Sequence, residues 1–338
     1  MCYLPLMIYR SKAPLRLCFS GEGTDVTPYP EEHGGAVLST AIDKFVFSTL
    51  KPSEEGSINV KSLDYDIVAK YTSDKDYELD GKLDLVKAAI KHMNADGGMF
   101  DIYIHSDAPP GSGLGSSSAA AVSIVGLLKN YQNRPFTDYE LAETACRIER
   151  DEVGILGGKQ DHYVSIFGGF NYIEFIGDKV IVNPLKIEMS TINELQYHLL
   201  LCYSGHNKLQ GNIIERQQEQ YKQNLDTLER IRTVTNDMKN ALLTDDLDSF
   251  GNLLDESWNY KKMLAPGITT DHIDKLYDTA KQNGAAGGKI MGAGGGGFML
   301  FYCEFDKKHK VAEELEKHGA QIAEFDFELR GLQTWQIS

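Results

Sequence analysis

A glycine- and serine-rich segment in the first half of the chain constrains the fold more than any other feature. It reads Pro109-Pro110-Gly111-Ser112-Gly113-Leu114-Gly115-Ser116-Ser117-Ser118-Ala119 and leads into a stretch, from about Leu114 to Lys129, that is apolar almost all round. Glycine permits positive φ and close backbone approach, so successive amides can form an anion-binding nest. A helix that follows adds unpaired amides and its dipole. The segment therefore predicts a polyphosphate-binding loop before a buried helix, although a turn that only caps a helix remains an alternative.

Two better-known nucleotide-binding patterns do not fit this segment. It lacks the Gly-Lys-Ser/Thr ending of a Walker loop, so no P-loop lysine is available. It also begins only at residue 109, without the glycine spacing or the early strand of a dinucleotide-binding fold. The segment therefore indicates a different class of phosphate-binding protein.

Two further segments have a related character. Residues 13–25 read Ala-Pro-Leu-Arg-Leu-Cys-Phe-Ser-Gly-Glu-Gly-Thr-Asp, and residues 289–298 read Lys-Ile-Met-Gly-Ala-Gly-Gly-Gly-Gly-Phe. Alone, the first predicts a strand that ends in a turn and the second a glycine-rich hairpin. Together with residues 109–119, and in this order, they resemble the three signatures of the GHMP kinases, a superfamily of small-molecule kinases. The resemblance extends from about Lys12 to Phe301.

The resemblance implies an α+β fold of two lobes, with ATP bound in the cleft between an N-terminal and a C-terminal domain. A chain of 338 residues is long for a single domain, which agrees with two lobes. Strand-like runs and turns alternate in the first half, whereas residues 207–282 have the pattern of long, charged helices. The change lies near residues 178–185. We therefore predict an N-terminal domain over residues 1–185 and a C-terminal domain over residues 186–338.

One predicted helix has a clear start. Thr137 and Glu140 form a capping-box pattern, and the helix that follows is amphipathic, so Glu149 is expected near its end at the edge of the core. A second helix is expected over residues 308–317. The expected strands are Leu15–Ser20, Ala36–Leu50, Met99–His105, Tyr197–Tyr203, Lys289–Met291, Phe298–Cys303 and Gln321–Phe327.

The family resemblance also implies which residues carry out phosphoryl transfer. In the family a serine of the second signature and a glutamate of the neighbouring helix hold magnesium, and an aspartate after a glycine-containing turn accepts the proton of the acceptor. The matching residues are Ser117, Glu149 and Asp161, with Arg16 as the cation beside the base. Ser116 or Ser118 could replace Ser117, and Glu152 could replace Glu149. The implied ATP-binding residues are Pro110, Gly111, Ser112, Gly113, Leu114, Gly115, Ser116, Ser117 and Ser118.

Other details resemble one branch of the superfamily. Gly-Glu-Gly-Thr-Asp at residues 21–25 replaces the Gly-Glu-His-Thr-Asp of galactokinases, and Gly-Gly-Lys-Gln-Asp-His-Tyr follows at residues 157–163. These features are similar to the D-glycero-D-manno-heptose 7-phosphate kinases, with fucokinase-type domains as near relatives. The branch phosphorylates an anomeric hydroxyl on the way to nucleotide-activated heptose. The expected acceptor-binding residues are Glu22, Asp25, Lys159, Gly294 and Gly295, and the candidates for the acceptor's phosphate are Lys159, Lys208, Lys261 and Lys262.

Three alternatives remain open at this point. The chain could be a fucokinase- or galactokinase-like kinase that acts on a free hexose. It could be a catalytically inactive scaffold, although Arg16, Ser117, Glu149 and Asp161 are all present. It could also be a mevalonate-type kinase or a decarboxylase of the same fold, which the segments at residues 21–25 and 157–163 disfavour.

Charge and cysteine usage limit the partners and the compartment. A formal net charge of −15 repels nucleic acid and anionic membranes, so an anionic substrate needs a local basic pocket. The five cysteines are scattered without a CxxC pair, and the nine histidines show no metal spacing, which indicates neither a disulfide framework nor a zinc site. The apolar opening, residues 1–7, is too short for a signal-peptide core. We expect a cytoplasmic enzyme that takes ATP, Mg²⁺ and a sugar or sugar phosphate, with a homodimer left open.

Overall fold

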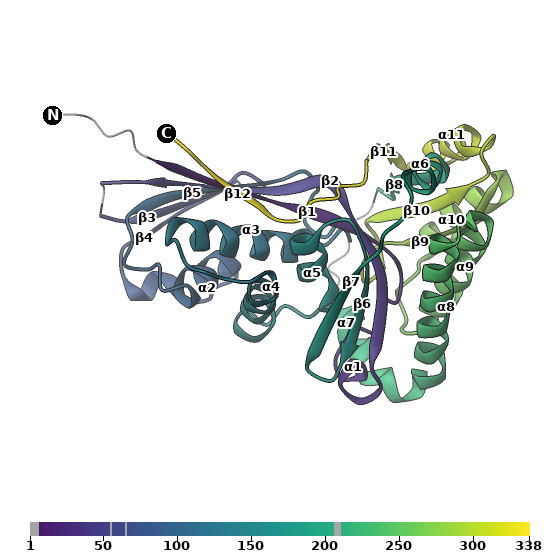
Figure 1. The fold of residues 1–338 in the computed structure, drawn as a ribbon, viewed down its shortest axis with the longest axis horizontal. Helices are drawn as coiled ribbons and strands as arrows, with labels where there is room; N and C mark the ends of the chain where they lie inside the picture. The colour runs from purple at the N-terminus through teal and green to yellow at the C-terminus, as the bar shows by residue number, and fades with distance from the viewer. Residues whose placement is uncertain (1–6, 55, 65, 206–210) are drawn as a thin grey trace.

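The computed structural model describes residues 7–54, 56–64, 66–205 and 211–338, which form two lobes that each combine a sheet with helices (Figure 1). The first and the last strand of the described chain, β1 and β12, both lie on the lobe built mainly from the first half of the chain. The predicted α+β class is confirmed.

The first sheet is mostly antiparallel and is organised around one long strand, β2. Its first half pairs with β6 and its second half with β5, while β1 runs beside most of its length. The strand order is β12-β1-β2-β5-β3-β4, with β7 beside β6, and β3 is parallel to β5. The strands are β1 (Ile8–Ser20), β2 (Gly35–Pro52), β3 (Ile58–Ser62), β4 (Ile67–Tyr71), β5 (Phe100–Ser106), β6 (Phe170–Ile176), β7 (Lys179–Pro184) and β12 (Gln333–Ile337).

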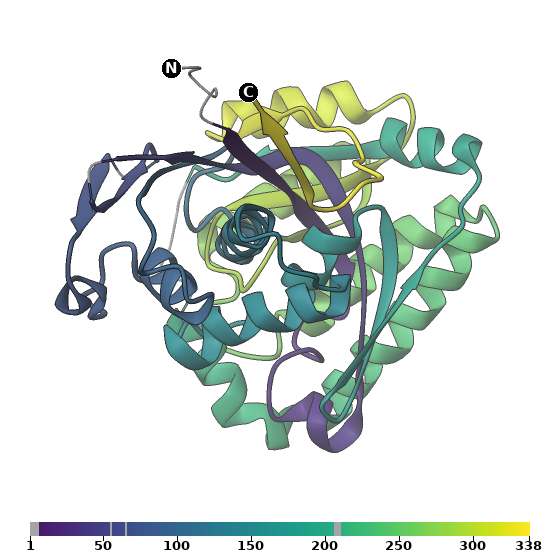
Figure 2. The same ribbon diagram turned by 60° about the vertical axis from the view of Figure 1, so that its left-hand side comes forward.

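Helices cover one face of this sheet, and the helix after the glycine-rich loop is the central one (Figure 1). This helix, α3, is seen nearly end-on in Figure 2, surrounded by other elements. Its composition of Ala, Val, Ile and Leu explains the position, because a helix that is apolar on all sides is stable only when it is buried all round. The helices of this lobe are α1 (Tyr29–His33), η1 (Asp74–Tyr77), α2 (Asp84–His92), α3 (Ser116–Tyr131), α4 (Asp138–Arg147), the π-helical turn η2 (Ile148–Glu152) and α5 (Gln160–Phe167).

The second sheet has the order β11-β8-β10-β9 and is packed by the long helices of the second half. Trp258 and Phe301 are fully buried in its core. Its strands are β8 (Leu199–Tyr203), β9 (Ala285–Ile290), β10 (Phe298–Cys303) and β11 (Gln321–Ala323). Its helices are α6 (Met189–His198), α7 (Gly211–Gln220), η3 (Tyr221–Asn224), α8 (Leu225–Leu243), α9 (Leu247–Lys261), α10 (Asp271–Asn283) and α11 (Lys308–Lys317).

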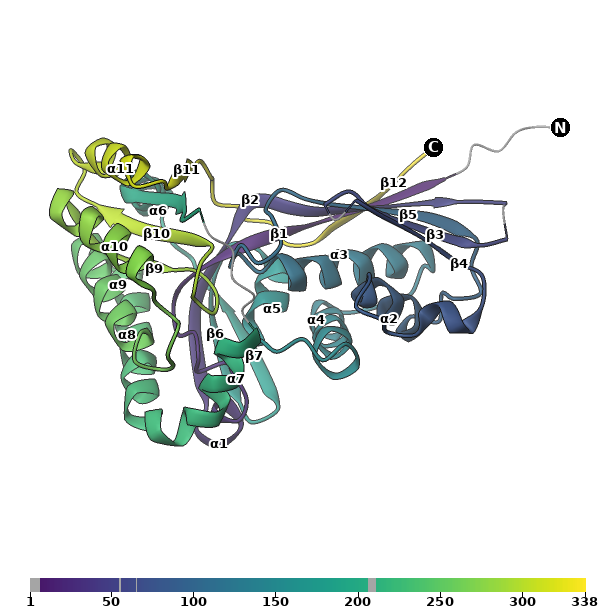
Figure 3. The same ribbon diagram turned by 180° about the vertical axis from the view of Figure 1, so that it is seen from behind.

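The end of the chain returns to the first sheet. The last strand, β12, pairs antiparallel with β1, so residues 333–337 complete the lobe to which the first strand belongs. From behind, β1 and β2 run from the far end of this lobe toward the base of the other one (Figure 3). The division into domains at residues 185 and 186 stays a prediction.

The capping box predicted at Thr137 is present. Thr137 is the N-cap of α4, its hydroxyl accepts from the Glu140 backbone, and the Glu140 carboxylate accepts from the Thr137 backbone. Two predicted strands are shorter in the structure than expected. The strand expected from Tyr197 begins at Leu199, since α6 continues to His198, and the one expected over Gln321–Phe327 ends at Ala323.

Candidate active site

The second glycine-rich segment forms a turn that leads directly into α3. Gly115 is its N-cap, in the left-handed region, and no side chain caps the helix, so its first amides stay available to a ligand. Gly113 also has a positive φ, of 83°, and a Cβ there would lie 2.5 Å from the Met291 carbonyl oxygen. Only glycine fits this position, because the backbones of the second and third glycine-rich segments touch there.

The third glycine-rich segment lies directly against the second. The Phe298 backbone amide donates to the Ser112 carbonyl at 2.9 Å, and Gly292 lies against the backbone of Gly113. Because β9 and β10 flank the third segment and α3 follows the second, these contacts join the two lobes at the two loops.

Arg16 and Asp161 form a bidentate ion pair beside the second loop. Arg16 Nε lies 2.7 Å from Asp161 Oδ1, and Nη2 lies 2.8 Å from Oδ2. The remaining Arg16 nitrogen, Nη1, donates to the Gly113 carbonyl at 2.5 Å. Burial alone would lower the pKa of Arg16, but the Asp161 charge outweighs it and raises the pKa above its ordinary value. The fixed guanidinium therefore holds the Asp161 carboxylate in one orientation.

Glu149 lies at the end of α4, in the π-helical turn, and its carboxylate is buried. Ser118 Oγ donates to Glu149 Oε2 at 2.7 Å, and His162 Nε2 lies 2.6 Å from the same oxygen. Burial works to raise the pKa of Glu149, but the His162 ring and the hydroxyls of Ser117 and Ser118 outweigh it and lower the pKa to about 2. Glu149 is therefore a buried, ionised carboxylate beside the glycine-rich loop.

Asp25 lies in the turn after β1 and is also buried. It accepts from the Gly23 backbone at 3.2 Å, from the Gln160 backbone at 3.4 Å and from Gln160 Nε2 at 3.1 Å. A Cβ at residue 158 would lie 1.9 Å from Asp25 Oδ2, so only glycine permits this close approach. Burial and the Asp161 charge raise the pKa of Asp25, whereas Arg150 opposes the shift.

Glu22 is held by two lysines from the other lobe. Lys261 Nζ donates to Glu22 Oε1 at 3.1 Å, and Lys289 Nζ contacts Glu22 Oε2. Burial would raise the pKa of Glu22, but Lys261 and Lys289 lower it to about 2. Burial lowers the pKa of Lys261 to about 8 in spite of the Glu22 charge, since Lys289 adds to the effect of burial. This Glu22–Lys261–Lys289 cluster is a buried link between the lobes.

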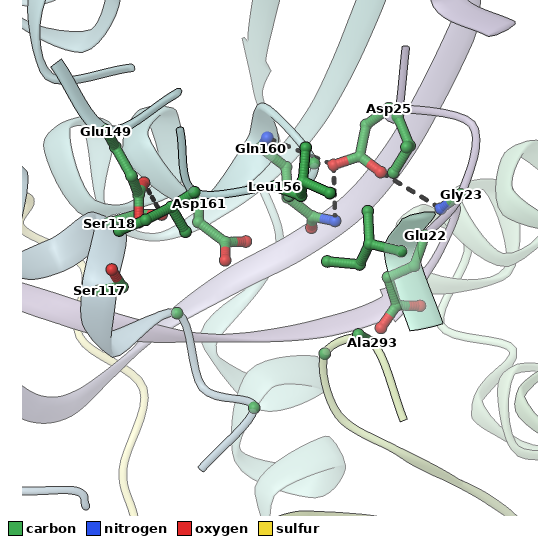
Figure 4. A pocket seen from close by; sticks show the side chains of 18 of the residues that line it. Glu22, Gly23, Asp25, Ser117, Ser118, Glu149, Leu156, Gln160, Asp161 and Ala293 are labelled. Atoms are coloured by element: carbon green, nitrogen blue, oxygen red, sulfur yellow. Dashed lines mark hydrogen bonds between the residues drawn. The ribbon is translucent and has the colours of Figure 1, made fainter. Parts of the chain in front are cut away.

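A cavity of about 160 Å³ joins these groups. In Figure 4, Glu149, Ser117 and Ser118 lie on one side of Asp161, and Asp25, Gln160, Leu156 and Glu22 lie on the other. We call these the phosphate side and the acceptor side of the cavity.

Two further cavities share residues with this one. The first, of about 420 Å³, has largely aliphatic walls from α2, α3 and β5, and it adjoins the loop at Gly111, Ser116 and Ser117. The second, of about 620 Å³, shares Arg150, Ile155, Leu156 and Gly157 with the central cavity. We call these the apolar cavity and the outer cavity.

The structure brings most of the expected site residues to the central cavity, but not all of them. Arg16, Glu22, Asp25, Glu149 and Asp161 line it, together with Gly111, Gly113 and Gly115–Ser118. Pro110 lines the apolar cavity instead, and Ser112 and Leu114 are fully buried behind the loop.

Three residues expected at the acceptor lie elsewhere. Lys159 lines the outer cavity, and its ammonium group pairs with Glu31 at 2.8 Å. Gly294 and Gly295 pack on Ile268, while Gly292 and Ala293 of the same segment line the central cavity. Lys208, expected as a phosphate ligand, lies outside the described residues.

Lys261 and Lys262, two further candidates for binding an acceptor's phosphate, also interact with other groups of the protein. Lys261 donates to the carbonyls of Ile290 and Gly292 as well as to Glu22. Lys262 places its ammonium group over the rings of Trp258 and Tyr277.

Sequence reasoning missed Arg150 at the cavity and two residues that contact carboxylates of the site, His162 and Lys289. His162 is fully buried against Glu149, a contact that the sequence analysis did not predict. Lys289 belongs to the third glycine-rich segment, and nothing in that pattern pointed to Glu22 as its partner. Arg150 directly follows Glu149 and lines both the central and the outer cavity. One feature of the sequence could have pointed to Arg150 as a site residue, namely that it directly follows Glu149, the expected metal ligand.

Two family models match the chain. The model of the GHMP kinases N terminal domain matches residues 84–169, and that of the GHMP kinases C terminal domain matches residues 238–321. Within the described part of the chain, no helix has the length and apolar character needed to cross a bilayer.

Similar proteins include both sequence relatives and solved structures. The chain is 34% identical over 335 residues to a D-glycero-alpha-D-manno-heptose 7-phosphate kinase of Campylobacter jejuni, which covers 97% of this chain and 99% of the relative. A crystal structure of a D-glycero-D-manno-heptose 1-phosphate kinase from Bacteroides thetaiotaomicron superimposes with a TM-score of 0.83 at 33% identity, over 98% of this chain and 99% of the other. A mevalonate kinase of Methanothermobacter thermautotrophicus is 27% identical over 309 residues, with 87% and 89% covered.

Proposed function

This chain belongs to the GHMP kinases, and we propose that it is an ATP-dependent sugar kinase that phosphorylates the anomeric hydroxyl of D-glycero-D-manno-heptose 7-phosphate. The observation that carries the proposal is the ion pair of Arg16 and Asp161, which faces a cavity between a glycine-rich loop and a polar acceptor side. A base, a phosphate-binding loop and a place for a hydroxyl donor are the parts that phosphoryl transfer requires.

ATP is assigned to the glycine-rich loop and the apolar cavity. The uncapped start of α3 offers backbone amides and the positive end of its dipole to the phosphates. The apolar cavity adjoins this loop at Ser116 and Ser117, and its aliphatic walls suit the faces of a purine base. The triphosphate then extends from the apolar cavity toward Asp161.

Asp161 is proposed as the general base. Its carboxylate accepts the proton of the attacking hydroxyl, and the Arg16 guanidinium fixes its orientation. The same fixed cation lies where negative charge develops during the transfer. An anomeric hydroxyl is more acidic than an ordinary alcohol, so it makes a smaller demand on this base.

Ser117 and Glu149 are proposed to hold Mg²⁺. The described residues contain no group of three or more His, Cys, Asp or Glu side chains suited to a metal. One ionised carboxylate and one hydroxyl nevertheless fit Mg²⁺, which is typically bound by one or two carboxylates together with the phosphates of a nucleotide. Ser118 and His162 both contact Oε2 of Glu149 and would hold this carboxylate in place for the metal. Mg²⁺ would neutralise charge on the transferring phosphates.

The acceptor is proposed on the basis of similarity, supported by the polar groups of the acceptor side. The names of the two heptose kinases differ in the position of the phosphate, 7-phosphate in one and 1-phosphate in the other. A heptose 7-phosphate that receives a phosphoryl group at its anomeric hydroxyl would suit nucleotide activation. A kinase that acts on a free hexose, as in the fucokinase branch, is the outcome that the test must distinguish.

The test is a kinase assay over a panel of sugars with and without a distal phosphate, and the position of the new phosphate is read by phosphorus NMR. We expect heptose 7-phosphate to give the highest kcat/KM and an anomeric phosphate as the product, with turnover abolished by excess chelator. Equal kcat/KM on the phosphorylated and unphosphorylated heptose, or a higher value on a free hexose, would contradict the proposed acceptor. Activity in excess chelator would contradict the role of Mg²⁺.

A further inference from the structure

The central cavity has an unusual balance of charges. Four acids line it, namely Glu22, Asp25, Glu149 and Asp161, against three bases, namely Arg16, Arg150 and Lys261. Arg16 pairs with Asp161, and Lys261 pairs with Glu22. Within the part of the chain that the structure describes, Arg150 is the base of this cavity that forms no ion pair with a carboxylate.

The guanidinium of Arg150 is held in place without being neutralised. Its Nη2 donates to the Gly157 carbonyl, and the side chain is partly buried at the point where the central and the outer cavity meet. A guanidinium has five N–H donors in a fixed plane, so one bond to a carbonyl leaves donors for a second ligand. Arg150 is therefore an oriented cation with its charge uncompensated.

Arg150 belongs to the acceptor side of the cavity. Its hydrogen bond reaches Gly157, and the next residue, Gly158, touches the Asp25 carboxylate. Asp25 feels the charges of both Asp161 and Arg150, which oppose each other in their effect on its pKa. A molecule that presents a hydroxyl to Asp161 and contacts Asp25 thus extends toward Arg150.

The size of the cavities points the same way. The central cavity, at about 160 Å³, is smaller than the roughly 300–1,000 Å³ of a ligand pocket. The outer cavity, at about 620 Å³, continues it past Arg150 and Leu156. Because the apolar cavity is assigned to ATP, the outer cavity offers the room for an acceptor with a long distal arm.

The remaining charges place an anion at the junction and not farther out. The outer cavity adds the bases Arg147 and Lys159, but Glu31 pairs with Lys159, and three more carboxylates, Glu143, Asp151 and Asp178, surround them. These acids would repel a phosphate from the outer part. A chain with a net charge of −15 needs a local cation to hold an anionic substrate. Arg147 also forms no ion pair within the described residues, but it shares the outer cavity with these acids, whereas Arg150 stands at the junction.

We propose that Arg150 binds the distal phosphate of the acceptor, as the residue that makes this kinase select a phosphorylated sugar over the free one. The inference rests on the proposed function, because it assumes a phosphomonoester on the acceptor. Arginine can bind two oxygens of a phosphate at once, and such a charge-assisted pair is strong in a partly buried site.

The experiment compares Arg150→Gln and Arg150→Lys with the wild-type enzyme on heptose 7-phosphate and on the unphosphorylated heptose. For Arg150→Gln we expect kcat/KM on the phosphorylated sugar to fall roughly 10- to 100-fold, while the value on the free sugar changes less than about 3-fold. Arg150→Lys keeps the charge without the fork and should lose an intermediate amount. Calorimetric titration of heptose 7-phosphate into ATP-free enzyme should show the same loss of affinity.

Arg147→Gln is the matched control. Arg147 lies three residues earlier, is exposed and lines the outer cavity but not the central one, so its loss removes the same charge from the same stretch. We expect its kcat/KM ratio between the two sugars to equal that of the wild type. Far-UV circular dichroism and melting curves of each variant show whether the segment that Arg150 holds through Gly157 remains folded.

The outcomes separate this inference from the proposed function. If wild-type enzyme does not prefer the phosphorylated sugar, the proposed acceptor is wrong whatever Arg150 does. If wild-type enzyme does prefer it, but Arg150→Gln loses equally on both sugars or raises only the KM for ATP, Arg150 serves the nucleotide and the inference is overturned. A folded Arg150→Gln variant that keeps the wild-type ratio overturns it as well.

Discussion

On the phosphate side of Asp161 the polar groups come from neighbouring stretches of chain, whereas on the acceptor side they come from distant ones. Ser117 and Ser118 open α3, and Ser118 bonds Glu149, which is only 31 residues away. Glu22, in contrast, is held by Lys261 and Lys289, which lie 239 and 267 residues farther along the chain. The first side is built within one lobe, and the second includes the Glu22–Lys261–Lys289 cluster, which forms only where the two lobes meet.

The two sides of the cavity also differ in how their charged groups are stabilised. On the phosphate side the backbone turn before α3 sets the geometry, and under the proposed function ATP and a metal would complete the site. On the acceptor side Glu22 is neutralised by Lys261 and Lys289, so removing one of these three leaves the others uncompensated. We therefore expect mutations on the phosphate side to change catalysis and mutations of the Glu22–Lys261–Lys289 cluster to change folding.

The largest effect is expected at Asp161, where the two sides meet. Asp161→Asn removes the base but keeps its shape, so kcat should fall by about 10² to 10⁴, toward the lower end for an anomeric hydroxyl, while the affinities for ATP and sugar change little. Steady-state kinetics and calorimetry measure the two separately. A near-normal kcat, or a loss confined to affinity, would show that Asp161 positions the acceptor and does not take its proton.

Glu22 should show the opposite behaviour, a loss of stability. Glu22→Gln leaves Lys261 and Lys289 buried without their carboxylate, and breaking a buried ion pair in this way costs about 3 to 5 kcal/mol in the free energy of unfolding. Urea denaturation measures it. The control is Glu324→Gln, which makes the same substitution at an exposed site and should change stability by less than about 0.5 kcal/mol.

The pH dependence of this loss checks its electrostatic origin. The pKa of Glu22 is lowered from 4.5 to about 2 in the folded protein, so its contribution is fully present above pH 4.5 and is lost as the pH falls toward 2. The stability difference between the wild type and Glu22→Gln should shrink over this range. A difference that is constant from pH 7 to the acid limit of folding would mean that shape, and not charge, is what Glu22 supplies.

These two sides also differ in how far the sequence could predict them. The turn before α3, the capped start of α4 and the position of Glu149 follow from local patterns, and the structure contains each of them. The ion pair of Arg16 and Asp161 was expected from the family resemblance, and the two side chains are in contact.

The partners of the lysines did not follow from any local pattern. Lys261 and Lys159 were expected to bind an acceptor's phosphate, yet each already pairs with a glutamate of the protein. The compensation of a buried charge depends on which distant segments meet, and that information is carried by tertiary packing and not by residue spacing. Arg150 was missed for a related reason. What distinguishes it is that it forms no ion pair with a carboxylate of the described residues, and only the three-dimensional structure shows this.

A smaller effect is expected on the phosphate side when His162, which contacts the Glu149 carboxylate, is replaced. His162→Leu removes the ring that holds the Glu149 carboxylate, and the affinity for the metal should fall about 10- to 100-fold, as is usual for the loss of a group that orients a ligand. Binding of Mn²⁺ in the presence of a non-hydrolysable ATP analogue, followed by electron paramagnetic resonance, measures this without turnover. His162→Gln, which keeps a donor near the same position, should recover part of the affinity. Unchanged Mn²⁺ binding in a folded His162→Leu variant would mean that Ser118 alone orients Glu149.

The smallest effect concerns α4, the one helix that supports both sides, since Glu149 and Arg150 follow each other at its end. Thr137 caps its start, roughly 18 Å from these residues at a rise of about 1.5 Å per residue. Thr137→Ala should cost about 1 kcal/mol in the free energy of unfolding, because it leaves the Glu140 amide without its partner, and Thr137→Ser should cost less. The end of α4 is held independently by Ser118 and by Gly157, so kcat and the preference for a phosphorylated sugar should both stay at the wild-type value. A fall in kcat alone would show that only the phosphate side depends on the start of the helix. A change in the sugar preference alone would show that only the acceptor side depends on the start of the helix.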